Sequence, residues 1–289
     1  MWVAEIVIGD VEEGTELPLV MMLHGRGDSP RLPGGPFARV PTPMRVLVPR
    51  GPLVLGDGFA WAKLSVTSGR FDEIAQDLLT QAERLARVIE HFRELRHTAG
   101  SPVVTGFSQG GMLAWILAMR YPDSVGLALP LAAWVPPLAR NEPLRAVPTR
   151  ALHGKSDSIV TIAPTRELVQ LLRQAGNEVE WVEYDGVGHE MTAAMNAQFE
   201  AWLEAALEER APGLRGGLGQ PGEDPEPMEV SEPALAVDLT QEAREPETAR
   251  DGGEADAFDG VEASPDEAGA PRRVDEPDAS RAAEARGRL

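Results

Sequence analysis

Ser108 lies in the run GFSQG at residues 106–110, which has the pattern glycine, any residue, serine, any residue, glycine. A β-branched apolar run at residues 103–106 leads into it, and a mostly apolar stretch at residues 109–120 follows it. A strand, a tight turn and a helix form the setting in which such a serine acts as a nucleophile. The two glycines fit that turn, because side chains there would collide with neighbouring atoms. We therefore interpret Ser108 as a candidate nucleophile rather than as a simple helix cap.

A nucleophilic serine needs a base and an acid, and Asp157 and His189 follow Ser108 in the order serine, acid, histidine. Each stands in a loop just after a predicted strand. We expect His189 to take the serine proton with one ring nitrogen and Asp157 to accept a hydrogen bond from the other. Asp185 is the rival acid, but it lies only four residues before His189 on the same loop. Because the far ring nitrogen is awkward to reach from there, Asp157 is favoured.

The run LHGRGD at residues 23–28 follows a predicted strand and could stabilise negative charge on a carbonyl oxygen. Two preorganised backbone N–H donors are the usual means. We expect one donor to be the backbone N–H of Gln109, the residue after the nucleophile, and the other to be that of Arg26. For His24 a loop-bracing role is favoured over a catalytic one. Whether the Arg26 side chain faces substrate or solvent stays open.

Other chemistries have little support in the sequence. The chain contains no cysteine, which excludes disulfides, a thiol nucleophile and thiolate metal ligands. No two histidines have the HExxH spacing, and no GxxxxGK[ST] phosphate loop occurs. We therefore expect neither a metal nor a cofactor.

The residues that could do chemistry must be positioned by alternating strands and helices. Short apolar runs bounded by glycine, proline or charge predict strands at residues 2–8, 19–23, 45–48, 103–106, 126–131, 149–152 and 178–184. Helical patterns occupy residues 71–95, 109–120, 165–174 and 191–208. This alternation predicts an α/β fold with a mostly parallel central sheet and helices on both faces.

The charge is uneven along the 289 residues and divides the chain in two. Residues 211–289 hold 20 acidic and 8 basic residues and a single aromatic residue, Phe258. Such a segment buries too little apolar surface to offset its ordering entropy, so we predict a catalytic domain at residues 1–210 and a disordered acidic tail at residues 211–289. The stretch at residues 233–239 could dock on the domain, but a solvated tail throughout is favoured.

The composition also limits the partners and the location. A net charge of −19 argues against nucleic acid and anionic membranes as partners. The first residues lack the basic and apolar regions of a secretory signal. The chain contains no run of about 18 apolar residues, so no membrane span is predicted. We expect a cytoplasmic protein that acts on a small molecule, while its oligomeric state stays open.

With these motifs assembled, the chain resembles the phospholipase/carboxylesterase family of α/β-hydrolases, which includes the acyl-protein thioesterases. The matching pieces are LHGRGD at 23–28, VPRGP at 48–52, GFAWAKL at 58–64, GFSQGG at 106–111, AAWVPP at 132–137, HGKSD at 153–157 and GH at 188–189. They cover roughly residues 17–207. The resemblance implies a compact α/β-hydrolase fold without a large lid domain and hydrolysis of short- to medium-chain esters or thioesters.

The same resemblance implies roles for two tryptophans, Trp61 and Trp134, which fall where family members line the acyl-binding cleft. Plain core packing is an equally good reading of both, since tryptophan is highly buried on average. Ala132-Ala133 stands where the family usually carries Ser-Gly or Ser-Cys, and Ala62-Lys63 where an aromatic residue and an acid are common. Both departures affect the expected pocket walls, so the substrate is left open.

Two other functions compete with a carboxylesterase or thioesterase. A serine peptidase or amidase could use the same triad, but peptidases of this fold usually carry an additional domain. A non-catalytic α/β-hydrolase scaffold could act as a binding module, but such proteins typically lose a triad member. The sequence therefore favours a serine hydrolase that acts on ester bonds.

Overall fold

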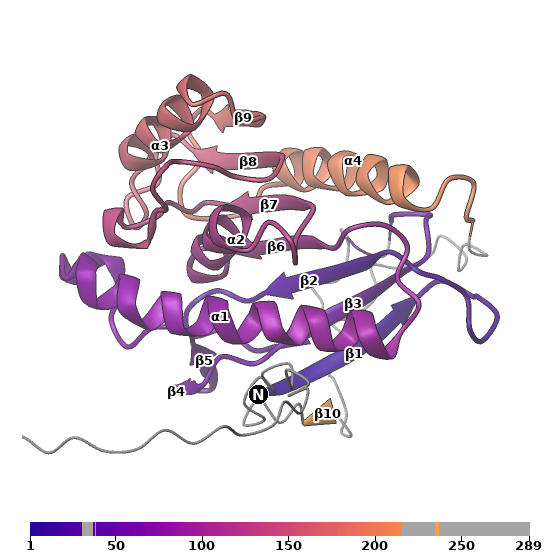
Figure 1. Cartoon of the computed structure of the whole chain (residues 1–289). Helices are drawn as coiled ribbons and strands as arrows, with labels where there is room; N and C mark the ends of the chain where they lie inside the picture. Colours follow the sequence, from indigo (N-terminus) through magenta and orange to yellow (C-terminus); the bar gives the residue numbers. More distant parts are fainter. Residues whose placement is uncertain (31–36, 38, 216–234, 237–289) are drawn as a thin grey trace, which may run out of the picture. The chain divides into compact units, whose positions relative to one another are not determined.

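A mostly parallel β-sheet forms the centre of the computed structural model, which describes residues 1–30, 37, 39–215 and 235–236 (Figure 1). All of these lie in one compact unit, Met1–Ala243. Among the described residues the sheet has eight strands, in the spatial order β10 (Leu235–Ala236), β1 (Trp2–Ile8), β3 (Met44–Pro49), β2 (Leu19–Leu23), β6 (Val103–Phe107), β7 (Leu127–Leu131), β8 (Thr149–Gly154) and β9 (Val179–Tyr184). Strand β1 is antiparallel to β3 and β10, and the other neighbours are parallel.

Helices cover both faces of this sheet. The four longest described helices are α1 (Phe71–Leu95), α2 (Gln109–Arg120), α3 (Ile162–Gln174) and α4 (Ala193–Arg210). Buried side chains of α1, α2 and α3 share one hydrophobic cluster with Met21 of β2, whereas those of α4 share a second cluster with the adjacent Val20. Since successive side chains of a strand point to opposite faces, α4 covers the face opposite to the other three helices.

The expected α/β architecture is confirmed, and the predicted helices differ from the observed ones only by small shifts at their ends. Helix α3 begins at Ile162, three residues earlier than expected. Its first turn can contain Pro164, since the missing N–H of a proline is tolerated there. Helix α4 begins at Ala193 rather than at residue 191, because the Thr192 side chain caps it by accepting a hydrogen bond from the Met195 N–H. No helix in the described ranges is long and apolar enough to cross a membrane.

A small hairpin that the sequence patterns did not indicate lies between β3 and α1. It consists of β4 (Leu53–Leu55) and β5 (Gly58–Ala60). Phe59 exchanges backbone hydrogen bonds with the loop after β2, donating to Asp28 O and accepting from Gly27 N. The hairpin thereby holds the segment that follows it, which begins with Trp61, beside that loop.

Most of the expected acidic tail lies outside the described residues. The exceptions are residues 211–215, which close the end of α4, and β10, whose two residues pair with Trp2 and Val3 at the edge of the sheet. Strand β10 falls inside the stretch that the sequence marked as able to dock. The separation into a domain and a disordered tail at residue 210 stays a prediction.

Deleting residues 216–289 should leave the domain folded. The lost segment holds 20 acidic and 7 basic residues and includes β10, only two residues at the edge of the sheet, whereas the described core is formed by residues before Arg210. We expect the melting temperature to change by less than about 4 °C, since about 1 kcal/mol shifts a domain of this size by roughly 2–4 °C. Thermal denaturation followed by circular dichroism measures this. A much larger fall would mean that the tail contributes to the core.

Candidate active site

The candidate site lies where the order of the strands reverses. From β2 the chain goes to β3 on one side, and β6 lies on the other side of β2. Such a switch point leaves a crevice at the carboxyl ends of the two central strands, where ligands of open α/β sheets bind. Leu23 at the end of β2 pairs with Gly106 of β6, so the loops that follow these strands start side by side.

Ser108 occupies the turn between β6 and α2 with φ 56° and ψ −117°, a backbone conformation that non-glycine residues rarely adopt. The flanking glycines are required because three backbones meet here. A methyl carbon at Gly106 would lie 2.5 Å from the Gly110 carbonyl carbon, and one at Gly110 would lie 2.1 Å from the Leu23 carbonyl oxygen. The turn therefore depends on both glycines of the GFSQG run.

The three residues expected to form a triad come together from three different loops. The Oγ atom of Ser108 lies 2.9 Å from Nε2 of His189, and Nδ1 of His189 lies 2.7 Å from Oδ2 of Asp157. An ionised carboxylate only accepts, so Nδ1 carries the ring hydrogen in this arrangement and Nε2 is left with a lone pair toward the hydroxyl. The geometry suits removal of the Ser108 proton by His189.

The carboxylate of Asp157 is fully buried and is held from several sides. Its Oδ1 atom accepts the backbone N–H groups of Ile159 at 2.9 Å and of Val160 at 2.8 Å. These bonds leave Oδ2 directed at His189. The rival acid Asp185 is 87% exposed and pairs with Lys155 at 2.9 Å, so the structure brings Asp157 rather than Asp185 to the histidine.

The loop after β2 carries the other expected donor. Gly25 lies against the turn between β6 and α2, since a methyl carbon at Gly25 would be 3.8 Å from Cβ of Ser108. Among the hydrogen bonds of the described residues, none uses the backbone N–H of the next residue, Arg26. The N–H of Gln109, in the first turn of α2, has no acceptor within its helix. Neither N–H thus has an acceptor in the described hydrogen bonds, and the oxyanion-binding role of Arg26 and Gln109 stays a prediction.

The side chain of Arg26 is exposed and donates from Nη2 to the carbonyl oxygen of Lys63 at 3.2 Å. His24 braces this loop, as the sequence favoured. Its Nδ1 atom lies 2.7 Å from the Gly25 carbonyl oxygen and its Nε2 atom accepts the N–H of Gly51 at 3.0 Å. Burial lowers the pKa of His24 below its ordinary value, consistent with a neutral structural ring.

The side chain of Gln109 has a role that the sequence patterns did not reveal. Its Oε1 atom accepts the N–H groups of Trp61 at 3.1 Å and Ala62 at 3.4 Å, and its Nε2 atom donates to the carbonyl oxygens of Ala62 at 3.4 Å and Leu64 at 3.1 Å. One buried amide therefore ties the residue after Ser108 to the segment at residues 61–64. Only the three-dimensional proximity of the two segments could reveal this contact.

The two tryptophans lie in different surroundings. Trp61 is fully buried, stacks on His24 with ring centroids 4.8 Å apart and donates its ring N–H to the His24 carbonyl oxygen at 2.9 Å. Trp134 is nearly buried and packs edge-on against Phe71 at 5.1 Å. Contact of either ring with a substrate stays a prediction, and Trp61 is mainly part of the packed loop structure.

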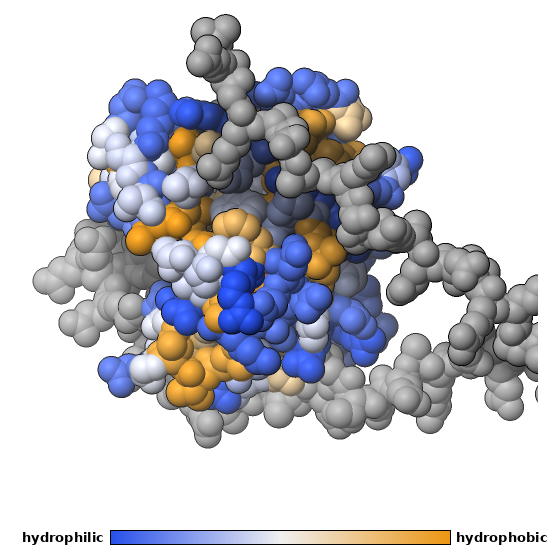
Figure 2. All heavy atoms as spheres, turned by 90° about the vertical axis from the view of Figure 1, so that its left-hand side faces the viewer, coloured by the Kyte–Doolittle hydropathy of each residue, from blue (hydrophilic) through white to orange (hydrophobic). Residues whose placement is uncertain are grey.

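Large hydrophobic side chains are exposed in the segments around Trp134 and Asp157. They include Phe71 beside Trp134, Ile159 two residues after Asp157, and Leu138 in the 3₁₀ helix Pro137–Ala139 that follows β7. Figure 2 views the side toward which the arrow of β2 points in Figure 1, and hydrophobic residues are interspersed there with hydrophilic ones.

Within the described ranges, no group of three or more histidine and acidic side chains could hold a metal ion.

Comparison with known proteins relates the chain to a family and to a fold. Residues 5–206 match the model of a family described as Phospholipase/Carboxylesterase. Acyl-protein thioesterase 1 of Gibberella zeae is 30% identical over 115 residues, which cover 36% of this chain and 48% of that protein. The matched segment spans about half the length, or less, of the first curated relatives, 42–48%.

Solved structures show the fold over a longer stretch. The esterase PE8 superposes with a TM-score of 0.61 at 21% identity and covers 71% of this chain and 99% of its own. A carboxylesterase of Bacillus cereus superposes with a TM-score of 0.57 at 22% identity, over 71% of this chain and 94% of its own. At these identities the likeness establishes the α/β-hydrolase fold.

Replacing Gly110 by alanine should strain the turn between β6 and α2, because the added methyl carbon would lie 2.1 Å from the Leu23 carbonyl oxygen. Overpacking costs about 1–3 kcal/mol, so the melting temperature should fall by several degrees. Gly188→Ala is the matched control, since nothing lies within 4 Å of an added methyl carbon there. Equal melting temperatures for the two variants would contradict the steric explanation.

Proposed function

Because the chain belongs to the phospholipase/carboxylesterase family, we propose that it hydrolyses carboxylic esters or thioesters through an acyl-enzyme on Ser108. The observation that carries this proposal is the continuous contact from Ser108 Oγ through His189 to Asp157, at 2.9 and 2.7 Å. Hydrogen-bond contact from nucleophile to base and from base to an orienting acid is the arrangement of serine hydrolases.

The mechanism follows from the hydrogen-bond roles. Ser108 Oγ attacks the acyl carbonyl carbon while His189 Nε2 takes the hydroxyl proton, and Asp157 stabilises the imidazolium that forms. The backbone N–H groups of Arg26 and Gln109 donate to the oxyanion of the tetrahedral intermediate. His189 then gives the proton to the leaving alcohol or thiol. Water, activated by the same histidine, releases the acid from the acyl-enzyme.

The exposed hydrophobic side chains support an acyl substrate of short to medium length. Ile159 lies two residues after Asp157, Phe71 packs on Trp134, and Leu138 lies in the 3₁₀ helix after β7. Their exposed side chains could offer apolar surface to an acyl chain. Burial of each methylene contributes about 0.8 kcal/mol, so chain length should affect kcat/KM strongly. A series of p-nitrophenyl esters and acyl thioesters of increasing length tests this, and activity on amides but not on esters would favour a peptidase or amidase.

A non-catalytic scaffold is the alternative of a different class. One relative from Oryza sativa is named a probable inactive carboxylesterase, so the family includes a member thought to lack activity. All three proposed triad residues are present here and in contact. Labelling of Ser108 by a fluorophosphonate probe separates the two ideas, because a scaffold without an activated serine stays unlabelled.

Replacing Ser108 by alanine should abolish hydrolysis while the protein stays folded. Loss of a triad serine lowers kcat by on the order of 10⁶-fold, leaving only binding and oxyanion stabilisation. Turnover of p-nitrophenyl butyrate measures the first effect and thermal denaturation the second. Retention of more than about one per cent of the activity by a homogeneous preparation would show that another residue is the nucleophile.

Replacing Asp157 by asparagine should lower kcat by about 10³- to 10⁴-fold, because an amide no longer favours the ring tautomer that the base needs. Asparagine keeps an oxygen that can accept the Ile159 and Val160 N–H groups, so the loop should persist. Asp185→Asn is the matched control and should leave kcat within about twofold, since this exposed side chain does not contact His189. The reverse pattern would make Asp185 the acid.

A further inference from the structure

A second histidine, His153, lies against the acid of the proposed triad without contacting the serine. It stands in β8, four residues before Asp157, and its side chain is 0% exposed. Its Nε2 atom is 3.3 Å from Oδ2 of Asp157, the oxygen that also contacts His189 Nδ1 at 2.7 Å. The mechanism above leaves this buried ring without a role.

The protonation of His153 follows from its neighbours. Its Nε2 atom lies 2.7 Å from the carbonyl oxygen of Val160, which can only accept, so this nitrogen carries a hydrogen. On the other side, Nδ1 lies 3.4 Å from the Thr165 hydroxyl, which also contacts the carbonyl oxygen of Ala133 at 3.1 Å. Burial lowers the pKa of His153, which favours the neutral ring.

These contacts form a closed cycle around the carboxylate. The N–H of Val160 donates to Oδ1 of Asp157, the carbonyl oxygen of Val160 accepts from His153, and the same His153 N–H lies beside Oδ2. Rotation of the carboxylate would move Oδ1 away from its backbone donors. His153 fixes the turn that carries these donors, and Oδ2 stays directed at His189.

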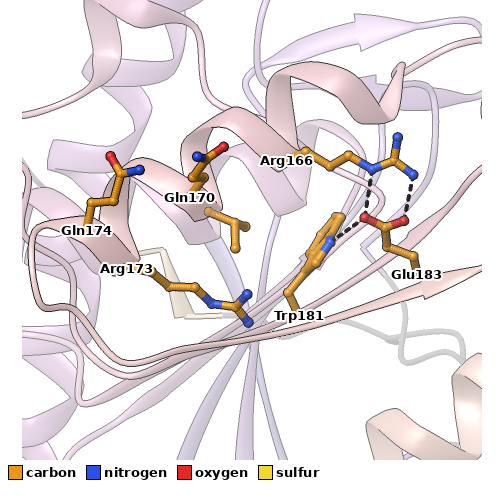
Figure 3. Close-up of a pocket in the computed structure, with 7 residues that line it drawn as sticks. Arg166, Gln170, Arg173, Gln174, Trp181 and Glu183 are labelled. Carbon is orange, nitrogen blue, oxygen red and sulfur yellow. Dashed lines mark hydrogen bonds and ion pairs between the residues drawn. The ribbon is translucent and has the colours of Figure 1, made fainter.

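The ring of His153 is itself held in place. Trp181 of β9 packs against it at 5.8 Å between ring centroids. Figure 3 shows Trp181 donating to Glu183, which also pairs with Arg166, at one side of a hollow of about 400 Å³ between α3 and β9. The lining of this hollow includes none of the proposed triad residues, but its Trp181 packs against the ring of His153.

We propose that His153 is a positioning residue, whose Nε2–H binds the Val160 carbonyl oxygen and thereby fixes the turn at residues 157–160 that directs the Asp157 carboxylate at His189. This inference rests on the proposed function, since it concerns the acid of the same triad. A small displacement of a supporting group can cost about 100-fold in rate. Loss of the His153 N–H should therefore lower kcat with little change in KM, because no substrate contact is removed.

Two amide variants isolate the N–H from the packing. Gln in place of His153 can bring an amide N–H to the position of Nε2, whereas Asn carries the same group on a side chain too short to reach it. With kcat and KM for p-nitrophenyl butyrate normalised to titrated active sites, we expect H153N to lower kcat by about 10- to 100-fold. We expect H153Q to stay within about threefold of the parent, and KM to change by less than about twofold in both.

Val169→Ala is the control for lost packing, because Val169 is buried in the hydrophobic cluster against which Trp181 packs and is not a hydrogen-bond partner of Asp157. It should lower the melting temperature while kcat stays within about twofold. A kcat for H153N equal to that of H153Q, or a drop in kcat for Val169→Ala as large as that for H153N, would overturn the proposal.

A measurement without substrate separates this proposal from the proposed function. The proton between His189 and Asp157 should give a far-downfield NMR resonance in the parent and in H153Q, and this resonance should be lost in H153N. If the resonance persists in H153N, His153 does not position the acid. Failure of the parent to turn over any ester would instead count against the proposed function.

A variant at Trp181 covers the case in which H153N does not fold. Trp181 is only partly buried, and Trp181→Ala enlarges the space around the His153 ring without removing its N–H. We expect kcat to fall by at least about threefold, with KM unchanged. An unchanged kcat in Trp181→Ala would contradict the proposal.

Discussion

The close approach of three backbones at the start of α2 is the constraint on which the site depends. The carbonyl oxygen of Leu23 occupies the space that a side chain at Gly110 would need, and Gly106 faces the backbone of Gly110 in the same way. The ends of β2 and β6 are paired here, Ser108 adopts a backbone conformation with positive φ, and its Oγ contacts His189. Steric crowding among main-chain atoms thus decides where the proposed nucleophile stands.

The buried polar groups around this turn are nearly all hydrogen-bonded, which makes the site rigid before any substrate binds. The amide of Gln109 binds the segment at residues 61–64, and His24 binds Gly51 and stacks on Trp61. An unpaired buried polar group costs about 1–3 kcal/mol, so these partners strongly favour one arrangement of the loops.

Electrostatics in the site is organised around one carboxylate. Asp157 receives two backbone N–H groups, lies against His153 and contacts His189. An ionised acid at this place can stabilise the positive charge that forms on His189 when a proton leaves Ser108. These contacts supply the charge distribution that acyl transfer would need. The proposed roles include neither a metal ligand nor a bound cofactor.

The sequence by itself determined the elements and the identities of the proposed reacting groups. Glycines at fixed distances from Ser108 and apolar runs of strand length are local signals, because they arise from sterics and burial within a few residues. The order of Asp157 and His189 along the chain follows from the topology of such a sheet. The hairpin β4–β5 was not predicted, because strands of three residues show too little periodicity. The hydrogen bonds from the Gln109 side chain to residues 61–64 could not be predicted from motif spacing. Only the tertiary structure placed Asp157 in contact with His189 and left Asp185 exposed, buried Trp61 in the loop packing and put His153 beside Asp157. Each of these depends on contacts between segments far apart in the chain, and local sequence does not encode which distant group will fill a given hydrogen bond.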